Sequence, residues 1–157
     1  EIIGINIFNF SKYMPNLKSG FLKLDEKLVK VIKDITSFDL SYKINKNNFK
    51  VGKVIKCEEV PNTHLHKTVI DIGSDKLNII CGAKNCKQDL KVVVATIGAI
   101  LPSGLIIKEG ELLGHKSFGM LCSAKELNIK DKFNQEGIIE LDDSYKVGSD
   151  FDDLYVF

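Results

Sequence analysis

The sequence predicts a mainly β protein, in which a small closed barrel follows a short α/β appendage. Two observations support this fold class. From residue 49 onward, short apolar runs alternate with Gly, Pro and Asn turn residues, which is typical of a small barrel. Between residues 24 and 38, apolar side chains instead recur with the period of a helix. A chain of 157 residues can hold one domain with a small addition, so we expect domains at 1–46 and 47–157, divided within the polar segment 41–48.

The first forty residues predict a strand followed by an amphipathic helix. Ile3, Ile5 and Ile7 alternate with other residues in the β-rich stretch 2–10. In the stretch 24–38, apolar residues at helical spacing leave the charged residues off the stripe, so this helix has one apolar face. That face needs a partner, and we expect it to be a sheet formed with the first strand.

The region after residue 49 predicts several short strands and one helical turn. A continuous apolar run at 91–97 indicates a strand that is buried on both faces. The turn residues Gly73-Ser74-Asp75 lie between two apolar runs and indicate a hairpin. The expected strands are 49–60, 69–72, 77–81, 91–97, 105–107 and 137–141, and the helical turn is 123–127. These elements fit a small barrel, but the strand pattern alone selects no particular barrel family.

Charge is unevenly distributed along the chain. All 22 basic residues are Lys, and 21 acidic residues oppose them, for a formal net charge of +1. Residues 49–125 carry eleven Lys and seven acids, whereas residues 126–157 carry three Lys and nine acids. A polyanion would be drawn to the basic middle of the chain, although Lys residues scattered over a solvated surface give the same counts.

The sequence contains no pattern that predicts a catalytic, metal or membrane site. The four Cys residues lack the C-x-x-C spacing of many zinc sites, and we expect them to be reduced cytosolic thiols. There is no Ser-His-Asp arrangement, no phosphate-binding loop and no apolar run of about 18 residues. His115 lies in a Gly-His-Lys loop, where we expect a solvated role. We therefore expect a cytoplasmic protein that is no enzyme, needs no cofactor or metal, and does not enter a membrane.

Four segments of the second region, spread over about 90 residues, carry a family resemblance. They are Val51-Gly52-Lys53-Val54 with Pro61-Asn62, Ile80-Cys81-Gly82-Ala83-Lys84-Asn85, the stretch from Val93 to Gly104, and the stretch from Ser117 to Leu127. Together they resemble the EMAP-II-like tRNA-binding domain of phenylalanyl-tRNA synthetase β-subunits, methionyl-tRNA synthetases and stand-alone proteins. The N-terminal stretch 4–9 and the helix after it resemble the extension of the stand-alone bacterial members of the YtpR type. The resemblance implies an OB-fold barrel that binds tRNA.

One turn departs from the family pattern. The family usually has His-Pro-Asn-Ala-Asp-Lys-Leu, where this chain has Val60-Pro61-Asn62-Thr63-His64-Leu65-His66-Lys67. Pro61 and Asn62 remain, but the acid and Lys that follow are altered, with a one-residue deletion. If this turn helps to grip tRNA, Lys67 or a protonated His64 or His66 could substitute, but unperturbed histidines are mostly neutral at pH 7.

The resemblance implies a set of RNA-binding residues, each of which also has a structural interpretation. The candidates are Asn62, Lys67, Lys84, Asn85, Lys116, Ser117, Phe118, Met120 and Ser123. We favour Lys84 and Lys116 as phosphate-binding cations because they flank the motif loops, although any single Lys can be a solvated surface charge. Asn62 and Asn85 can equally stabilise turns, and Met120 can equally belong to the core. Hydroxyl groups of the two serines could reach a phosphate or a ribose 2′-OH.

Aromatic residues are too few for serial base stacking. Phe49 and Phe118 are the aromatic residues between positions 49 and 125, and Phe118 beside the motif loop is the one plausible stacking residue. We therefore expect structured tRNA to be bound through its shape and phosphates by a bacterial, non-catalytic protein. Two alternatives remain: an N-terminal fragment of a phenylalanyl-tRNA synthetase β-subunit, and a dimeric chaperone-like interaction module. A homodimer and an association with an aminoacyl-tRNA synthetase are possible partners besides tRNA.

Overall fold

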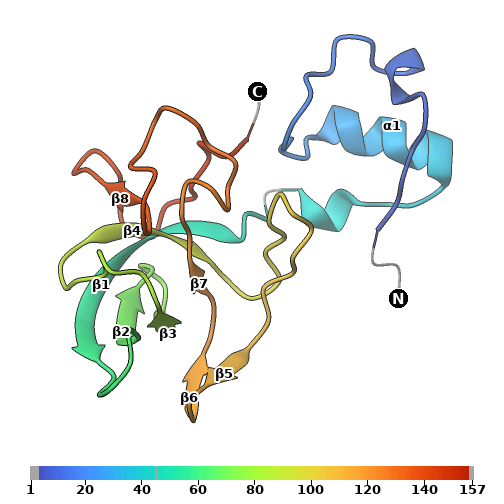
Figure 1. Ribbon diagram of the computed structural model, residues 1–157. Helices are drawn as coiled ribbons and strands as arrows, with labels where there is room; N and C mark the ends of the chain where they lie inside the picture. The colour runs from blue at the N-terminus through green and yellow to red at the C-terminus, as the bar shows by residue number, and fades with distance from the viewer. Residues whose placement is uncertain (1–3, 45, 156–157) are drawn as a thin grey trace. The chain divides into compact units, whose positions relative to one another are not determined.

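The computed structural model describes residues 4–44 and 46–155. The chain separates into two compact units, of which the first is Glu1–Lys46 with Tyr155–Phe157 and the second is Asn47–Leu154. Each unit has its own elements, which Figure 1 shows in chain order. The second unit contains every strand of the described residues.

The first unit is built around helix α1, which spans Glu26–Thr36. Asp25 caps its start, because the backbone amide of Leu28 donates to Asp25 Oδ1 at 2.7 Å. The helix ends where Ser37 adopts a left-handed conformation with a φ of 63°. Leu28 and Val29 are its buried residues, and Val31, Ile32 and Ile35 are half-buried, so the packed face follows the apolar stripe seen in the sequence only in part. Two short 3₁₀ helices, η1 at Phe10–Lys12 and η2 at Ser41–Lys43, flank α1.

The strand expected at 2–10 is absent over residues 4–10, so that part of the prediction is wrong. Asn9 has a φ of 55°, and the chain turns there into η1 instead of continuing extended. A single strand also needs a partner for its backbone groups, and the described part of this unit offers none. Residues 2 and 3, at the start of the expected strand, lie outside the described residues.

The second unit is a barrel-like antiparallel sheet centred on a long first strand. Strands β1 (Phe49–Glu59), β2 (His66–Asp71), β3 (Lys76–Cys81), β4 (Lys91–Ala95) and β7 (Met120–Leu121) follow the order β3-β2-β1-β4-β7. The first half of β1 pairs with β4 and its second half pairs with β2. An irregularity in the pairing between Val54 and Lys56 separates the two halves, and such a bulge bends a strand enough for it to serve two sides of a barrel. Strand β8 (Glu140–Leu141) also pairs with β4, on the edge away from β1 that β7 uses as well.

The barrel closes where β3 meets the segment between β6 and β7. The backbone amide of Phe118 donates to the Asn78 carbonyl at 2.8 Å, and the Ile80 amide donates to Ser117 Oγ at 3.1 Å. A separate hairpin of β5 (Gly110–Leu112) and β6 (His115–Ser117) leads into this contact (Figure 1). The nearly closed sheet is an OB-like barrel, and the predicted mainly β fold class is confirmed.

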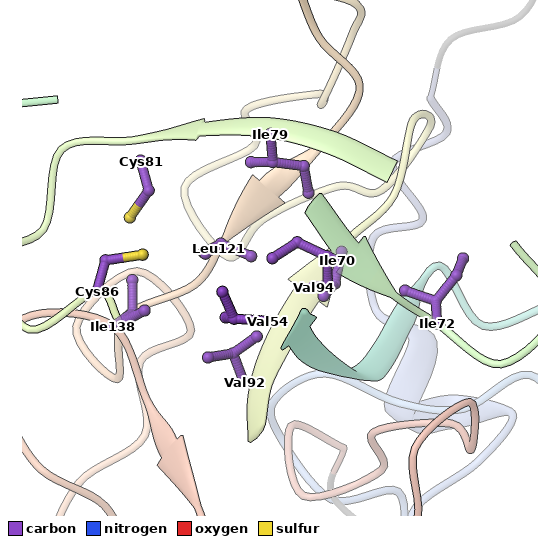
Figure 2. Close-up of a cluster of buried hydrophobic side chains, with 10 residues drawn as sticks. All are labelled: Val54, Ile70, Ile72, Ile79, Cys81, Cys86, Val92, Val94, Leu121 and Ile138. Carbon is purple, nitrogen blue, oxygen red and sulfur yellow. The ribbon is translucent and has the colours of Figure 1, made fainter. Parts of the chain in front are cut away.

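The barrel interior is filled by branched aliphatic side chains. Figure 2 shows Val54, Ile70, Ile79, Val94 and neighbouring residues packed together, and these four side chains have no exposed surface. Strand β4 was predicted to be buried on both faces, and residues 92–95 are indeed completely buried. The expected strand at 105–107 is reduced to a single bridge between residues 100 and 106, and 123–127 forms turns.

Candidate nucleic-acid interface

Three adjoining hollows run along the outer face of β3. One has a volume of about 460 Å³ and is bordered by both Asn78 and Ile80. A hollow of about 410 Å³ shares Asn78 with it, and a hollow of about 560 Å³ shares Ile80. Residues 78 and 80 project from the same face of β3 because side chains alternate along a strand, whereas Ile79 points into the core. We call the surface formed by these three hollows the β3 groove.

Lysine side chains from different strands border the central hollow of the β3 groove. Lys67 of β2, Lys116 of β6 and Lys56 of β1 all line it. Lys56 forms an ion pair with Glu58 at 2.8 Å and Lys116 forms one with Glu109 at 3.5 Å, and all four side chains are more than half exposed. Exposed pairs of this kind are screened by water and exchange readily for other anions. The groove can therefore offer cations to a phosphate backbone.

Glu58 of β1 is the cross-strand partner of Lys67. The pKa of Glu58 is lowered, chiefly by the hydrogen bond from Lys56 and further by the nearby positive charges of Lys56 and Lys67. Glu58 therefore stays ionised at neutral pH and partly balances the lysines.

Phe118 and Met120 supply apolar surface to the groove. Phe118 is half-buried and borders two of the three hollows, so one part of its ring anchors the barrel while another remains accessible. Met120 is half-buried and borders the largest hollow. Both positions leave room for contact with a ligand, in addition to their packing role.

The two candidate serines make hydrogen bonds within the protein. Ser117 Oγ accepts from the Ile80 amide and donates to the Gly119 carbonyl at 3.3 Å, which fixes the barrel closure. Ser123 borders the largest hollow, but its hydroxyl donates to Glu126 Oε2 at 2.7 Å and accepts from the Glu126 amide at 3.2 Å. This reciprocal arrangement resembles a capping box.

Asn85 holds two loops together. Its Nδ2 donates to the Ile138 carbonyl and to Glu140 Oε1, both at 2.9 Å, and its Oδ1 accepts from the Ile138 amide at 3.0 Å. Gly137 passes so close that an added Cβ would lie 2.1 Å from Asn85 Oδ1. We call this arrangement the Asn85 clamp. Between the RNA contact and the structural role considered from sequence, the geometry favours the structural role.

The structure gathers only some of the predicted residues along the β3 groove. Lys67, Lys116, Phe118, Met120 and Ser123 border it, and Ser117 lies at the closure beneath it. The other three predicted residues lie outside these hollows. They are Asn62, at a φ of 61° in the exposed β1–β2 turn, Lys84, exposed after β3, and Asn85 in its clamp.

Sequence reasoning missed several residues that border the groove. His115, expected to be solvated, is half-buried there, and Lys56 and Asn78 also line the central hollow. The alternation of β1 and β3 already indicated which of their residues face outward. The strand pairing that brings β1, β3 and β6 together was absent from that pattern.

Three of the four thiols converge at one end of the core. Cys57 Sγ lies 3.9 Å from Cys86 Sγ, and Figure 2 shows the sulfurs of Cys81 and Cys86 turned toward each other. The hydrogen bond from Cys86 lowers the pKa of Cys81, and the same bond together with burial raises the pKa of Cys86. Burial raises the pKa of Cys122 to about 12. Within residues 4–44 and 46–155, no group of three or more His, Cys, Asp and Glu side chains is placed to hold a metal ion.

No helix in the described part of the chain is both long enough and apolar enough to span a membrane.

The fold and the groove define a class of protein. OB barrels bind oligonucleotides on an open strand face and with adjoining loops, which is where the lysine-lined β3 groove lies. A family model described as "Putative tRNA binding domain" matches residues 49–150, and a model described as "Domain of unknown function (DUF4479)" matches residues 1–50. The chain belongs to this tRNA-binding domain family.

Similar proteins share either the whole chain or the barrel region. The "Putative tRNA-binding protein YtpR" of Bacillus subtilis is 40% identical over 161 residues, covering 96% of this chain and 78% of that protein. The "Uncharacterized protein MG449 homolog" of Mycoplasma pneumoniae is 39% identical over 163 residues, covering 99% and 69%. The phenylalanine–tRNA ligase beta subunit of Yersinia pestis is 49% identical over 106 residues, covering 66% of this chain and 13% of the subunit. The predicted family resemblance is confirmed.

A solved structure is also similar. The crystal structure of MetRS related protein from Pyrococcus horikoshii aligns over 64% of this chain and 85% of that chain, with a TM-score of 0.48 and 22% identity.

Proposed function

We propose that this protein is a non-catalytic tRNA-binding protein that holds structured tRNA in the β3 groove. The observation that carries the proposal is the convergence of Lys67 and Lys116, from separate strands, on one hollow within the region matched by the tRNA-binding family. The match to a tRNA-binding family and the similarity to a tRNA-binding protein support a role in which the bound RNA is held and not altered. A tRNA ligand also implies action in the cytoplasm.

The groove binds through phosphates and shape. Lysine side chains contact the backbone as point charges, and the release of counterions from the RNA drives association. With one accessible aromatic ring, Phe118, the groove is poorly equipped to stack a series of single-stranded bases. A folded RNA presents its phosphates in a fixed arrangement, which separate lysines on rigid strands can match.

The first test is the salt dependence of tRNA binding. Dissociation constants for a transcribed tRNA are measured by fluorescence anisotropy across a series of KCl concentrations. We expect the logarithm of the association constant to fall linearly with the logarithm of the salt concentration, with a slope of about −0.7 to −0.9 for each phosphate contact. A flat plot would contradict the electrostatic mechanism.

The second test reverses charge inside and outside the groove. The double variant Lys67→Glu/Lys116→Glu should weaken tRNA binding at least tenfold. It should also make the salt dependence less steep, by the slope that corresponds to about two phosphate contacts. The matched control is Lys130→Glu/Lys146→Glu, which makes the same change of net charge at exposed positions outside the groove. If both double variants weaken tRNA binding by the same factor, the β3 groove is not the binding site.

Three further elements belong to this proposal. We propose that 1–46 is an appendage built around α1 and that 47–157 is the tRNA-binding domain, in line with the two compact units, which divide between Lys46 and Asn47. A homodimer and an association with an aminoacyl-tRNA synthetase are proposed partners, the second motivated by the similarity to a phenylalanine–tRNA ligase beta subunit. Sedimentation of the protein alone and with a synthetase measures both associations.

The match of residues 1–50 to a separate family model favours a stand-alone tRNA-binding protein over a synthetase fragment.

A further inference from the structure

The tip of the β5–β6 hairpin carries an unusual turn. Leu112 pairs with His115, so Leu113 and Gly114 form a two-residue turn, with φ angles of 51° and 78°. Positive φ at both positions is the geometry of a type I′ turn, in which Asn-Gly and Gly-Gly are strongly preferred. Leu at the first position is strained, because its Cβ crowds the backbone in the left-handed region.

The strained leucine is also exposed. Leu113 keeps 63% of its surface exposed and its neighbour Leu112 keeps 47%. A side chain so exposed adds little to the packing of the barrel, and Asn or Gly would relieve the strain of the turn. The hairpin extends from the lower end of the barrel in Figure 1, outside the six-stranded sheet. An exposed residue that is unfavourable for its own turn suggests a contact with another molecule.

The surroundings of the tip identify that molecule as nucleic acid. Gly114, His115 and Lys116 of the same hairpin border the central hollow of the β3 groove, together with Lys67. A polyanion lying on these lysines therefore passes beside the tip. Leu113 and Gly114 at the tip carry no charge, so the tip itself suits an uncharged base, whereas Lys116 further along the hairpin borders the hollow where a phosphate would lie. Leucine is among the apolar side chains that proteins insert against unstacked bases.

We propose that Leu113, supported by Leu112, packs against the face of an unstacked tRNA base whose neighbouring phosphates are bound by Lys67 and Lys116. The inference rests on the proposed tRNA-binding function and adds a specific feature to it. The groove recognises a place in folded tRNA where a base is accessible beside a fixed phosphate backbone. Such bases occur in loops and at bulges, and not within a continuous double helix.

The decisive variant is Leu113→Asn, because it improves the turn while removing the apolar side chain. Asn-Gly suits the type I′ turn, so the urea midpoint of unfolding should stay the same or rise. tRNA affinity should nevertheless fall about tenfold, as expected when one base loses an apolar contact. The salt slope should stay unchanged, because no phosphate contact is removed. The matched control is Leu105→Asn, which changes another leucine that is 57% exposed and lies outside the groove.

A second RNA probe checks the nature of the contact. A fully paired RNA duplex of matched length should bind wild-type protein and Leu113→Asn with equal affinity, because it offers no unstacked base. Equal tRNA affinity of wild type and Leu113→Asn would overturn the inference, and so would a difference in oligomeric state between the two proteins on sedimentation. In either case, a wild-type protein that still binds tRNA through Lys67 and Lys116 leaves the proposed function standing. Failure of the wild type to bind tRNA would overturn both.

Discussion

The Asn85 clamp and the central hollow of the β3 groove make opposite use of residues that were predicted to bind RNA. Asn85 directs three hydrogen bonds at residues 138 and 140, so its amide group is fully engaged within the protein. Lys67 and Lys116 instead border an open hollow, where the ion pair between Lys116 and Glu109 is long and exposed. The clamp fixes a loop in place, and the groove leaves charges available to a ligand.

This difference shows why a motif is an ambiguous guide to an interface. A residue can belong to a family motif because it binds the ligand, and it can equally belong there because it holds the scaffold that binds the ligand. The two roles differ in the free-energy cost of removing the side chain. A buried hydrogen-bonding group leaves unsatisfied partners behind, whereas an exposed charge returns to water. Measurements of stability and of tRNA affinity should therefore separate the two regions.

The largest effect is expected from Asn85→Ala. Its three hydrogen bonds include both backbone groups of Ile138: the Ile138 amide would lose its acceptor inside a partly buried loop, whereas the carbonyl would keep its bond from Asn134 Nδ2 at 2.8 Å. We expect the free energy of unfolding to fall by roughly 3 kcal/mol, measured by urea denaturation followed by circular dichroism. Asn16→Ala is the control, since Asn16 is exposed in a turn and has no positive φ. At a temperature where the variant remains folded, its tRNA affinity should match wild type, and a weaker affinity would restore Asn85 as an RNA contact.

A smaller effect is expected on the reactivity of the thiols beside the clamp. Cys81 and Cys86 are each only 5% exposed, so alkylation requires the loop at 82–90 to open. Loosening the clamp with Asn85→Ala should raise their rate of modification by iodoacetamide about tenfold, if about 1.4 kcal/mol of the lost stability acts on local opening. Peptide mapping by mass spectrometry gives the rate at each position. Unchanged rates would show that the clamp does not hold this loop.

The pH dependence of alkylation separates Cys81 from Cys122. The thiolate is the reacting form, and the hydrogen bond from Cys86 lowers the pKa of Cys81. Cys81 should therefore gain reactivity at lower pH than an unperturbed thiol as pH rises. Burial raises the pKa of Cys122 to about 12, so Cys122 should stay unreactive through pH 9. Reaction of Cys122 at the same pH as Cys81 would contradict both assignments.

Much of the barrel was predictable from local pattern, and much of the groove was not. The apolar run at 91–97 predicted a doubly buried strand because such a strand has no polar face, and β4 has that character. The β-rich stretch at 2–10 failed because strand pattern does not provide a pairing partner, and its described part turns at Asn9. Lys67 and Lys116 are 49 positions apart in sequence, and only strand pairing brings them to one hollow. No local pattern distinguishes them from Lys84, which lies outside it.

A still smaller effect is expected from Ser117→Ala at the barrel closure. The Ile80 amide loses its acceptor, and the contact between β3 and β6 is weakened. We expect a loss of about 1 kcal/mol in the free energy of unfolding, with tRNA affinity changed less than twofold. Ser103→Ala is the matched control, because the Leu105 amide reaches Ser103 Oγ only at 3.4 Å in an exposed turn. A large loss of affinity with little loss of stability would instead make Ser117 an RNA contact, as the family resemblance suggested.

The smallest effect is expected from Lys84→Glu, which tests the boundary of the groove. Lys84 is exposed in the loop after β3 and does not border the three hollows, so it acts on RNA only through its charge at a distance. We expect a loss of about twofold in tRNA affinity at low salt, which disappears at higher ionic strength because the Debye length shortens to about 8 Å at 0.15 M. Lys67→Glu should cost about tenfold under the same low-salt conditions and should retain part of that loss at 0.15 M salt, because a direct phosphate contact is replaced by repulsion. If Lys84→Glu weakens binding as much as Lys67→Glu at both salt concentrations, the loop that the Asn85 clamp holds is itself part of the interface. The clamp would then position a cation for the ligand, and the contrast between the two regions would be one of distance from the RNA rather than of role.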